Sequence, residues 1–148
     1  MEFSVFSDDH YMGEAIKEAK KAFEKDEVPI GAVIVCDNQI IAKAHNLTEK
    51  LNDVTAHAEM QAITAASDYL GGKYLKNCTI YITLEPCLMC AGALQWSQIS
   101  KIVYAAEDDK KGFSKYNKNV FHPKTEIIKG IRSEECAGML KEFFQSKR

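Results

Sequence analysis

The sequence of 148 residues predicts an α/β fold in which a five-stranded mixed sheet carries helices on both of its faces. Two observations support this prediction. Segments with helical and with strand-like spacing of apolar residues follow one another in the order α-ββ-α-β-α-β-β-α. The chain also has neither an internal repeat nor a low-complexity linker. We therefore expect a single domain over residues 1–148, long enough to bury a substantial core.

The first helix is predicted over residues 8–26, because apolar side chains recur there at helical spacing on one face. The segment Val28-Pro29-Ile30-Gly31 breaks this pattern. The apolar run 32–36 and the segment 39–44 predict two strands, and the turn signal Asp37-Asn38 between them indicates a hairpin.

A polar loop over residues 45–53 leads to the second helix, which we expect from residue 55 to the glycine pair at 71–72. The segment 79–84 alternates and is rich in β-branched residues, which predicts the third strand. The third helix is expected over residues 87–97.

The C-terminal part begins with a fourth predicted strand over residues 101–106. A polar, lysine-bearing loop over residues 108–124 and a fifth strand over residues 125–129 follow. Ser133 is expected to cap a last helix that buries an apolar face. The residues of this face are Cys136, Met139, Leu140, Phe143 and Phe144.

Two short motifs carry the chemistry. His57-Ala58-Glu59 stands near the start of the second helix, and Pro86-Cys87-Leu88-Met89-Cys90 follows the third strand. Together they fit the H-x-E…P-C-x-x-C signature of zinc-dependent nucleobase deaminases. His57, Cys87 and Cys90 would bind one Zn²⁺ and leave a fourth position for water, whose pKa the metal lowers to about 7.

Glu59 would then move the protons of the reaction. It would take a proton from the zinc-bound water, pass it to the ring nitrogen and later to the departing amine. Residues i and i+2 do not share a helix face, so we expect His57 to stand at the helix entry. The N-termini of two helices would point at the metal, where their partial positive charge favours thiolate and hydroxide.

Two other interpretations of the cysteine pair stay open at this point. A Cys-x-x-Cys motif alone is also typical of redox-active proteins, but that function leaves His57 and Glu59 without a role. A structural zinc site would need a fourth protein ligand. His10, His45, His122 or another cysteine could supply it, although none has ligand-like spacing.

The composition is ordinary for a globular protein and excludes several classes. The net charge of −2 provides no overall attraction to nucleic acid, so an RNA contact must come from a local patch. No apolar run approaches the roughly 18 residues of a membrane span. The N-terminus lacks a signal-peptide pattern. Cys36, Cys78 and Cys136 lie in apolar patterns and are expected as buried hydrophobes, which predicts a reducing cytoplasm.

Over nearly its whole length the chain resembles bacterial tRNA adenosine deaminases of the cytidine deaminase superfamily. The resemblance is carried by the segments 27–33, 44–46, 55–59, 83–93 and 134–144. It implies a cytidine deaminase-like three-layer α/β/α sandwich, one Zn²⁺ per chain and a homodimer. It further implies conversion of the wobble adenosine in an arginine tRNA anticodon to inosine, with the target base of a splayed anticodon loop entering the zinc pocket.

The resemblance also implies roles for individual residues. The base-binding asparagine of the family matches Asn46, the loop aspartate near the flanking nucleotides matches Asp108, and an aromatic pair matches Phe143 and Phe144. Adjacent helical residues cannot both face the core, so one phenylalanine could be exposed and stack on a base, or instead cover the sheet or a subunit interface. The expected substrate contacts are Asn46, Val28, Pro29, Ala58, Leu84, Asp108 and Phe144.

One position departs from the family pattern. The family commonly has an arginine just before the loop aspartate, and this chain has Glu107, whose carboxylate would repel phosphate. Other cations could restore a basic rim around the pocket. They are Lys110, Lys111, Lys115, Lys118, Lys147 and Arg148.

Two further functions are compatible with the motifs. A free-base deaminase acting on guanine or cytosine would cover its pocket with its C-terminal tail, whereas residues 133–144 resemble the tRNA enzymes. A non-catalytic RNA-binding zinc subunit is expected to lack the proton-shuttling glutamate, which is present here as Glu59. We expect the homodimer interface on the third helix around Leu94, Trp96 and Ser97, because tryptophan is enriched in interfaces.

Overall fold

The computed structural model describes residues 6–147, which form five strands and five helices. In chain order these are α1 (Asp8–Glu24), β1 (Gly31–Cys36), β2 (Gln39–His45), α2 (Ala58–Leu70), β3 (Cys78–Leu84), α3 (Leu88–Ser97), β4 (Lys101–Ala106), α4 (Phe113–Tyr116), β5 (Glu126–Lys129) and α5 (Ser133–Ser146). The expected order of elements is confirmed, with α4 as one additional short helix.

The strands form one mixed sheet in the order β2-β1-β3-β4-β5. β1 runs antiparallel to both β2 and β3, whereas β3, β4 and β5 are parallel. Asp37 and Asn38 both have positive φ, of 51° and 62°, so the hairpin between β1 and β2 closes on a turn that matches the twist of its strands. The carboxyl ends of β3 and β4 lie at the same edge of the sheet, where ligand sites of such folds usually form.

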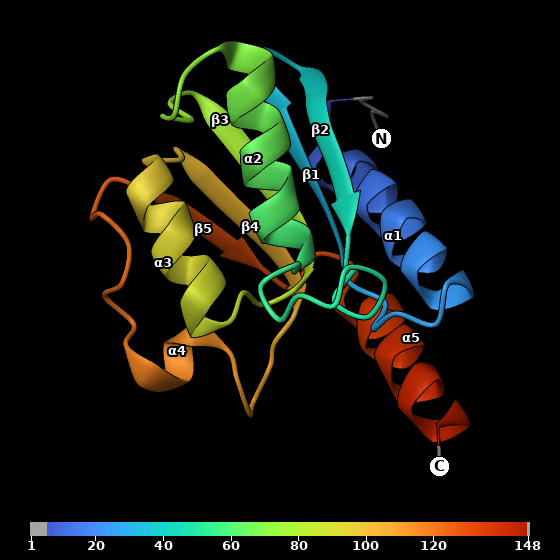
Figure 1. Cartoon of the computed structure of the whole chain (residues 1–148). Coiled ribbons are helices and arrows are strands. Elements are labelled where there is room, and N and C mark those ends of the chain that lie inside the picture. Colours follow the sequence, from blue (N-terminus) through green and yellow to red (C-terminus); the bar gives the residue numbers. More distant parts are fainter. Residues whose placement is uncertain (1–5, 148) are drawn as a thin grey trace.

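Two layers of helices cover the sheet (Figure 1). α2 and α3 pack on one face through small and branched side chains such as Ala62 and Leu94, and α1 and α5 pack on the other through Met12, Ile16 and Cys136. This arrangement confirms the expected three-layer α/β/α sandwich. Gly31 brings α1 close to β1, because a Cβ atom there would lie 2.1 Å from the carbonyl oxygen of Ala15.

Several boundaries differ from the sequence-based expectations. α2 begins at Ala58 rather than at residue 55, because the Asp53 carboxylate accepts bonds from the N–H and hydroxyl of Thr55 at 2.8 and 2.7 Å and holds a turn there. α1 ends at Glu24, two residues early, and Asp26 then has a φ of 65°. The expectation that Ser133 caps α5 is wrong. Arg132 occupies the cap with a φ of 60° and forms no side-chain cap bond.

The short helix α4 lies within the segment that was expected to be a loop. Its first residue, Phe113, is buried between Tyr104 and Phe121, with ring centroids 6.1 and 4.9 Å away. Such a four-residue helix depends on tertiary packing and leaves little periodic signal in the sequence.

The five cysteines of the chain are free thiols. Cys78 and Cys136 are buried as expected, whereas Cys36 is only partly buried. None of the helices within residues 6–147 combines the length and the apolar character needed to cross a membrane.

Candidate functional site

The ends of two helices bring the predicted metal ligands together. His57 occupies the N-cap of α2 and Cys87 the N-cap of α3, each with extended backbone, and Cys90 lies in the first turn of α3. Neither N-cap side chain bonds to its own helix. The two N-termini therefore meet beside the carboxyl ends of β3 and β4, at the lower ends of α2 and α3 in Figure 1. The expected placement of His57 at the helix entry is confirmed.

The distances between these side chains suit a zinc ion. His57 Nδ1 lies 3.7 Å from Cys87 Sγ and 3.5 Å from Cys90 Sγ, and all three ligand atoms lie within 4.8 Å of one another. A tetrahedral Zn²⁺ with ordinary bond lengths places its nitrogen and sulfur ligands about 3.6 Å apart. The donor set therefore fits the metal, with three protein ligands and room for a fourth from solvent.

The other histidines do not complete this group into a four-ligand structural site. In the described part of the chain, the metal-binding cluster consists of His57, Cys87 and Cys90 alone. His45 Nδ1 instead lies 3.3 Å from Glu18, and His122 Nδ1 accepts a bond from the N–H of Lys124. The three-ligand arrangement is that of a catalytic zinc site.

The thiols respond to each other's charge. Hydrogen bonding from Cys90, assisted by His57, lowers the pKa of Cys87 well below its usual range. Hydrogen bonding to Cys87 together with burial raises the pKa of Cys90. The hydrogen bond with Cys87 also raises the pKa of His57. Metal ligands must be deprotonated to bind, so a thiol with a lowered pKa favours metal binding at this site.

Glu59 adds a carboxylate to this centre from the first turn of α2. Its side chain is 4% exposed, and within residues 6–147 its Oε1 atom has no hydrogen-bond partner. Burial raises the pKa of Glu59 to about 7. A buried carboxyl group with a free oxygen and such a pKa can both accept and release a proton near neutral pH.

A cavity of about 790 Å³ opens next to these residues. His57, Glu59 and Cys87 lie on its wall. Five of the expected substrate contacts line it as well, namely Val28, Asn46, Leu84, Asp108 and Phe144. Pro29 and Ala58 are not on its wall, and both are buried. Their expected direct contact with substrate therefore finds no support in the geometry.

Asn46 presents a hydrogen-bond donor to the cavity. Its side chain is buried, and Oδ1 accepts a bond from the N–H of Ala58 at 3.0 Å. This bond fixes the orientation of the amide, because only the oxygen can accept from a backbone N–H. The Nδ2 group is left as a hydrogen-bond donor at the cavity wall. Ala58 thus contributes through its backbone rather than through its side chain.

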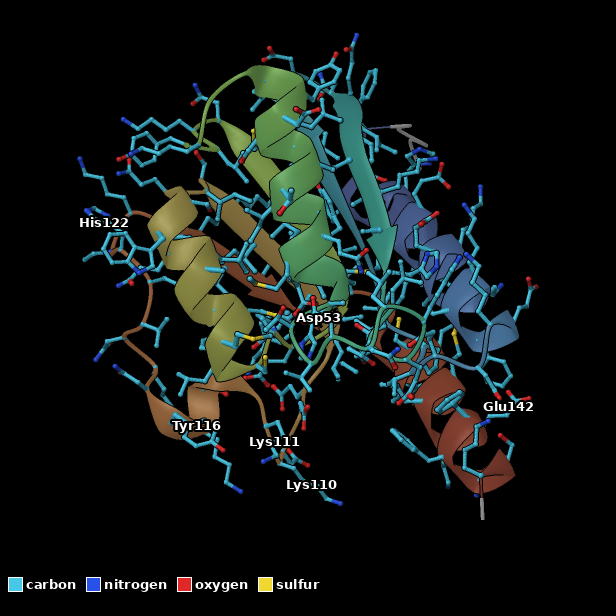
Figure 2. The ribbon with its side chains drawn as sticks, in the orientation of Figure 1. Asp53, Lys110, Lys111, Tyr116, His122 and Glu142 are labelled. Atoms are coloured by element: carbon cyan, nitrogen blue, oxygen red, sulfur yellow. The ribbon has the colours of Figure 1, made fainter. Side chains whose placement is uncertain are left out.

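The mouth of the cavity combines exposed apolar and charged side chains. Phe143 is buried, with its ring 5.6 Å from that of Phe23, whereas Phe144 is 49% exposed and lines the mouth. Figure 2 shows Lys110 and Lys111 at the tip of the segment between β4 and α4. The Asp108 carboxylate accepts bonds from both of their N–H groups and so shapes this tip.

The negative charge of Glu107, the position at which the chain departs from the family pattern, is offset by a neighbouring lysine. Lys129 of β5 donates to Glu107 Oε1 at 2.7 Å, and both side chains are exposed to solvent. This surface pair contributes little to stability, but it cancels the negative charge beside the cavity. The basic rim expected from the sequence therefore depends on Lys110 and Lys111 among the lysines that line the cavity.

The cavity wall includes residues that were not anticipated from the sequence, among them Val54, Glu85 and Met89. Met89 lies inside the Cys-x-x-Cys motif, but its spacing from Cys87 does not by itself place it at the cavity. Val54 is 85% exposed, and an exposed valine has no local signal. Glu85 is buried, and the contacts that bury it come from a segment more than twenty residues away.

The fold and the site define a zinc-dependent deaminase. Residues 6–106 match the family described as the cytidine and deoxycytidylate deaminase zinc-binding region. The tRNA-specific adenosine deaminase of Bacillus subtilis (strain 168) is 50% identical over 146 residues, which is 95% of this chain and 91% of that protein. The enzyme of the same name from Aquifex aeolicus (strain VF5) is 45% identical over 95% of each chain.

Solved structures agree with this relationship. One solved structure comes from a study of A-to-I editing by tRNA:A34 deaminases at the wobble position of transfer RNA. It matches 88% of this chain and 98% of its own, with a TM-score of 0.82 and 41% identity. The guanine deaminase of Bacillus subtilis is 40% identical, but the match covers 66% of this chain and 62% of that one, with a TM-score of 0.63. The chain belongs to the family of tRNA-specific adenosine deaminases within the zinc-dependent cytidine deaminase superfamily.

Proposed function

We propose that this protein converts the wobble adenosine of a tRNA anticodon, in particular that of an arginine tRNA, to inosine by zinc-dependent hydrolysis. One observation carries the proposal. The buried Glu59 carboxylate, with one oxygen free, lies beside the group of His57, Cys87 and Cys90 in a cavity that opens to solvent. Relatives that share 45–50% identity over 95% of the chain carry the name of this activity.

The metal would be held by His57, Cys87 and Cys90. Zinc bound there supplies the Lewis acidity that makes hydroxide available at neutral pH. Glu59 would accept one proton of the attacking water and deliver it to the ring nitrogen next to the reacting carbon. It would then take the proton of the hydroxyl group added to that carbon and give it to the amine, which leaves as ammonia, while the oxygen becomes the carbonyl of inosine. The burial of Glu59 keeps bulk water from competing for these protons.

The cavity walls hold the base in place for this transfer. Val28 and Leu84 provide apolar surface, and Asn46 directs its Nδ2 donor at the base. The ring nitrogens of adenine that stay unprotonated are hydrogen-bond acceptors, so a donor whose orientation is fixed matches them. The backbone N–H of Ala58 takes part indirectly, because it holds Asn46 in this orientation.

The mouth of the cavity favours a substrate larger than a free base. A cavity of about 790 Å³ leaves room beyond one base, and exposed Phe144 and Val54 stand at its rim. Aromatic side chains stack on splayed bases, and lysines contact phosphates. Lys110, Lys111 and Asp108 would meet the nucleotides that flank the target.

We further propose that the chain acts as one domain over residues 1–148, forms a homodimer and works in the cytoplasm. The support for a dimer is an apolar surface on α3, where Leu88, Met89 and Trp96 are 47%, 37% and 81% exposed. The earlier expectation that Leu94 and Ser97 belong to this surface is wrong, because both are buried against the protein's own core.

A substrate comparison tests the proposed reaction. The zinc-loaded protein is incubated with an arginine tRNA anticodon stem-loop, and separately with adenosine, guanine and cytosine, and inosine and ammonia are measured. We expect inosine in the stem-loop, and no product from a stem-loop with guanosine at the target position. Rapid deamination of free guanine with an inert stem-loop would instead support the free-base alternative. The 40% identity to a guanine deaminase is the observation that favours this alternative.

A further inference from the structure

Glu85 is a buried carboxylate that the mechanism above does not use. It directly follows β3, its side chain is 3% exposed, and it lines the candidate active-site cavity. The ion pairs formed within residues 6–147 do not include it. A buried charge without a cation must be compensated by hydrogen bonds, because its desolvation is otherwise costly.

One segment supplies all the bonds that this carboxylate accepts. Oε1 accepts from the N–H of Asp108 at 3.1 Å, and Oε2 accepts from the N–H and the hydroxyl of Ser114 at 3.0 and 2.7 Å. Bonds to an ionised acceptor are stronger than bonds between neutral groups. The segment from Asp108 to Ser114 is therefore organised around the side chain of Glu85.

Gly112 permits this close approach. A Cβ atom at this position would lie 2.4 Å from the carboxyl carbon of Glu85 and 2.5 Å from each of its oxygens. The backbone of Gly112 has ordinary angles, with φ −61° and ψ 146°. Glycine is needed there for space and not for an unusual conformation.

The segment is also attached to the backbone that carries the metal ligand. The N–H of Phe113 donates to the carbonyl of Pro86 at 2.9 Å, and Gly112 forms an isolated β-bridge with Cys87. The bonds of Glu85 thus join two parts of the cavity, one that carries Cys87 and one that forms the mouth.

We propose that Glu85 is a positioning residue that fixes the segment 108–114 for capture of the RNA substrate, an inference that rests on the function proposed above. This segment carries Asp108, Lys110 and Lys111 at the cavity mouth (Figure 2). The oxygens of Glu85 are occupied by the segment itself, so Glu85 acts through the segment. Its loss should weaken substrate capture and leave the proton transfer by Glu59 nearly intact.

Glu85→Gln tests this with a minimal change of shape. An NH₂ group replaces one oxygen and must face a backbone N–H of Asp108 or of Ser114, so at least one bond is lost. We expect the KM for the anticodon stem-loop to rise about tenfold and kcat to change less than about threefold. Zinc content should stay at the wild-type level, and amide hydrogen exchange should become faster in residues 108–114.

Glu142→Gln is the matched control, because Glu142 is an exposed residue of α5 that points away from the protein (Figure 2). It should change none of these quantities. Gly112→Ala perturbs the same contact from the other side and should reproduce the effects of Glu85→Gln. If Glu85→Gln does not fold, Ser114→Ala tests the proposal instead, because it removes only the bond from the hydroxyl to Glu85. We expect its KM to rise about threefold, with faster exchange in residues 108–114 and unchanged zinc content.

Each result has a defined meaning. Unchanged exchange in residues 108–114, or faster exchange with an unchanged KM, overturns the proposal. A fall in kcat with loss of zinc also overturns it, because Glu85 would then serve the metal site. If the wild-type protein does not deaminate the stem-loop at all, the proposed function fails, and the exchange measurement still shows whether Glu85 holds the segment.

Discussion

Intramolecular hydrogen bonds occupy some polar atoms of the cavity wall and leave others free to bond to a substrate. The oxygen of Asn46 is used by Ala58, which leaves the amide nitrogen, and both oxygens of Glu85 are used by the segment 108–114. Glu59 differs from them, because one of its oxygens finds no partner within residues 6–147. Of these three buried side chains, Asn46 thus offers a fixed donor and Glu59 a carboxyl group that can exchange protons.

The role of Glu59 can be separated from that of the metal ligands. Glu59→Gln keeps the shape of the side chain but cannot carry the proton, so we expect kcat to fall by about 10³-fold with normal zinc content. Cys87→Ala removes a ligand and should lose most of the zinc. Metal analysis and single-turnover assays on both variants check this. A Glu59→Gln protein with a tenth of wild-type activity would exclude the proton-transfer role.

The donor at Asn46 can be inverted without disturbing its structural bond. Asn46→Asp retains an oxygen for the N–H of Ala58 and places an acceptor where the substrate needs a donor. We expect kcat/KM for the stem-loop to fall roughly tenfold to a hundredfold, and the melting temperature to fall because the new carboxyl group is buried. Steady-state kinetics together with thermal unfolding make the comparison. Wild-type kinetics in this variant would show that Asn46 does not contact the base.

At this scale the sequence singles out the three side chains that the structure brings together, and it says little about the residues that support them. His57, Cys87 and Cys90 stand in short motifs whose spacing reflects local helix geometry. The partnership of Glu85 with Ser114 depends on how two distant segments meet in space, and nothing local in the sequence encodes it. The contact of Asp108 with substrate, which rests on the resemblance, stays a prediction, whereas its observed bonds from the N–H groups of Lys110 and Lys111 shape the loop.

At the scale of elements, the ends of the helices rather than their faces position the side chains of the candidate metal site. α2 and α3 each start with a proposed metal ligand, His57 or Cys87, in the N-cap position, so both helix dipoles favour the negative charge of thiolates. The helices and strands were predictable from apolar periodicity. α4 was not, because Phe113 is held by Tyr104, Phe121 and the carbonyl of Pro86 rather than by its own propensity.

The outer surface of α3 gives a test of assembly. Trp96 is 81% exposed and stands on the same helix as exposed Leu88 and Met89. Exposed large apolar side chains that gather on one element often mark an interface. We expect Trp96→Glu to convert a dimer to a monomer in light scattering at micromolar concentration, with little loss of folded structure. Lys20→Glu, at an exposed position of α1 on the other side of the sheet, should stay dimeric. A monomeric wild-type protein would contradict the proposed homodimer.

At the scale of the whole molecule, the mixed sheet and its two helical layers followed from the order of elements, whereas the strand order β2-β1-β3-β4-β5 did not. Strand order depends on which strands pair over long distances, and periodicity within each strand does not specify the partner. The result places the carboxyl ends of β3 and β4 next to the N-termini of α2 and α3. That edge is where the metal group, Glu59 and the cavity lie.

The overall charge predicts how RNA binding responds to salt. The net charge is −2, and Lys129 is already paired with Glu107, so the cations at the cavity mouth are few. If Lys110 and Lys111 account for most phosphate contacts, the logarithm of the stem-loop affinity should fall with the logarithm of salt concentration with a slope of about −1.4. Fluorescence anisotropy between about 50 and 200 mM salt measures this slope. Lys110→Gln should make the slope shallower by about 0.7. Glu107→Gln should release Lys129 for RNA and make the slope steeper.

A slope near zero would mean that phosphates are not contacted, and a slope of about −5 would require a basic surface outside this cavity.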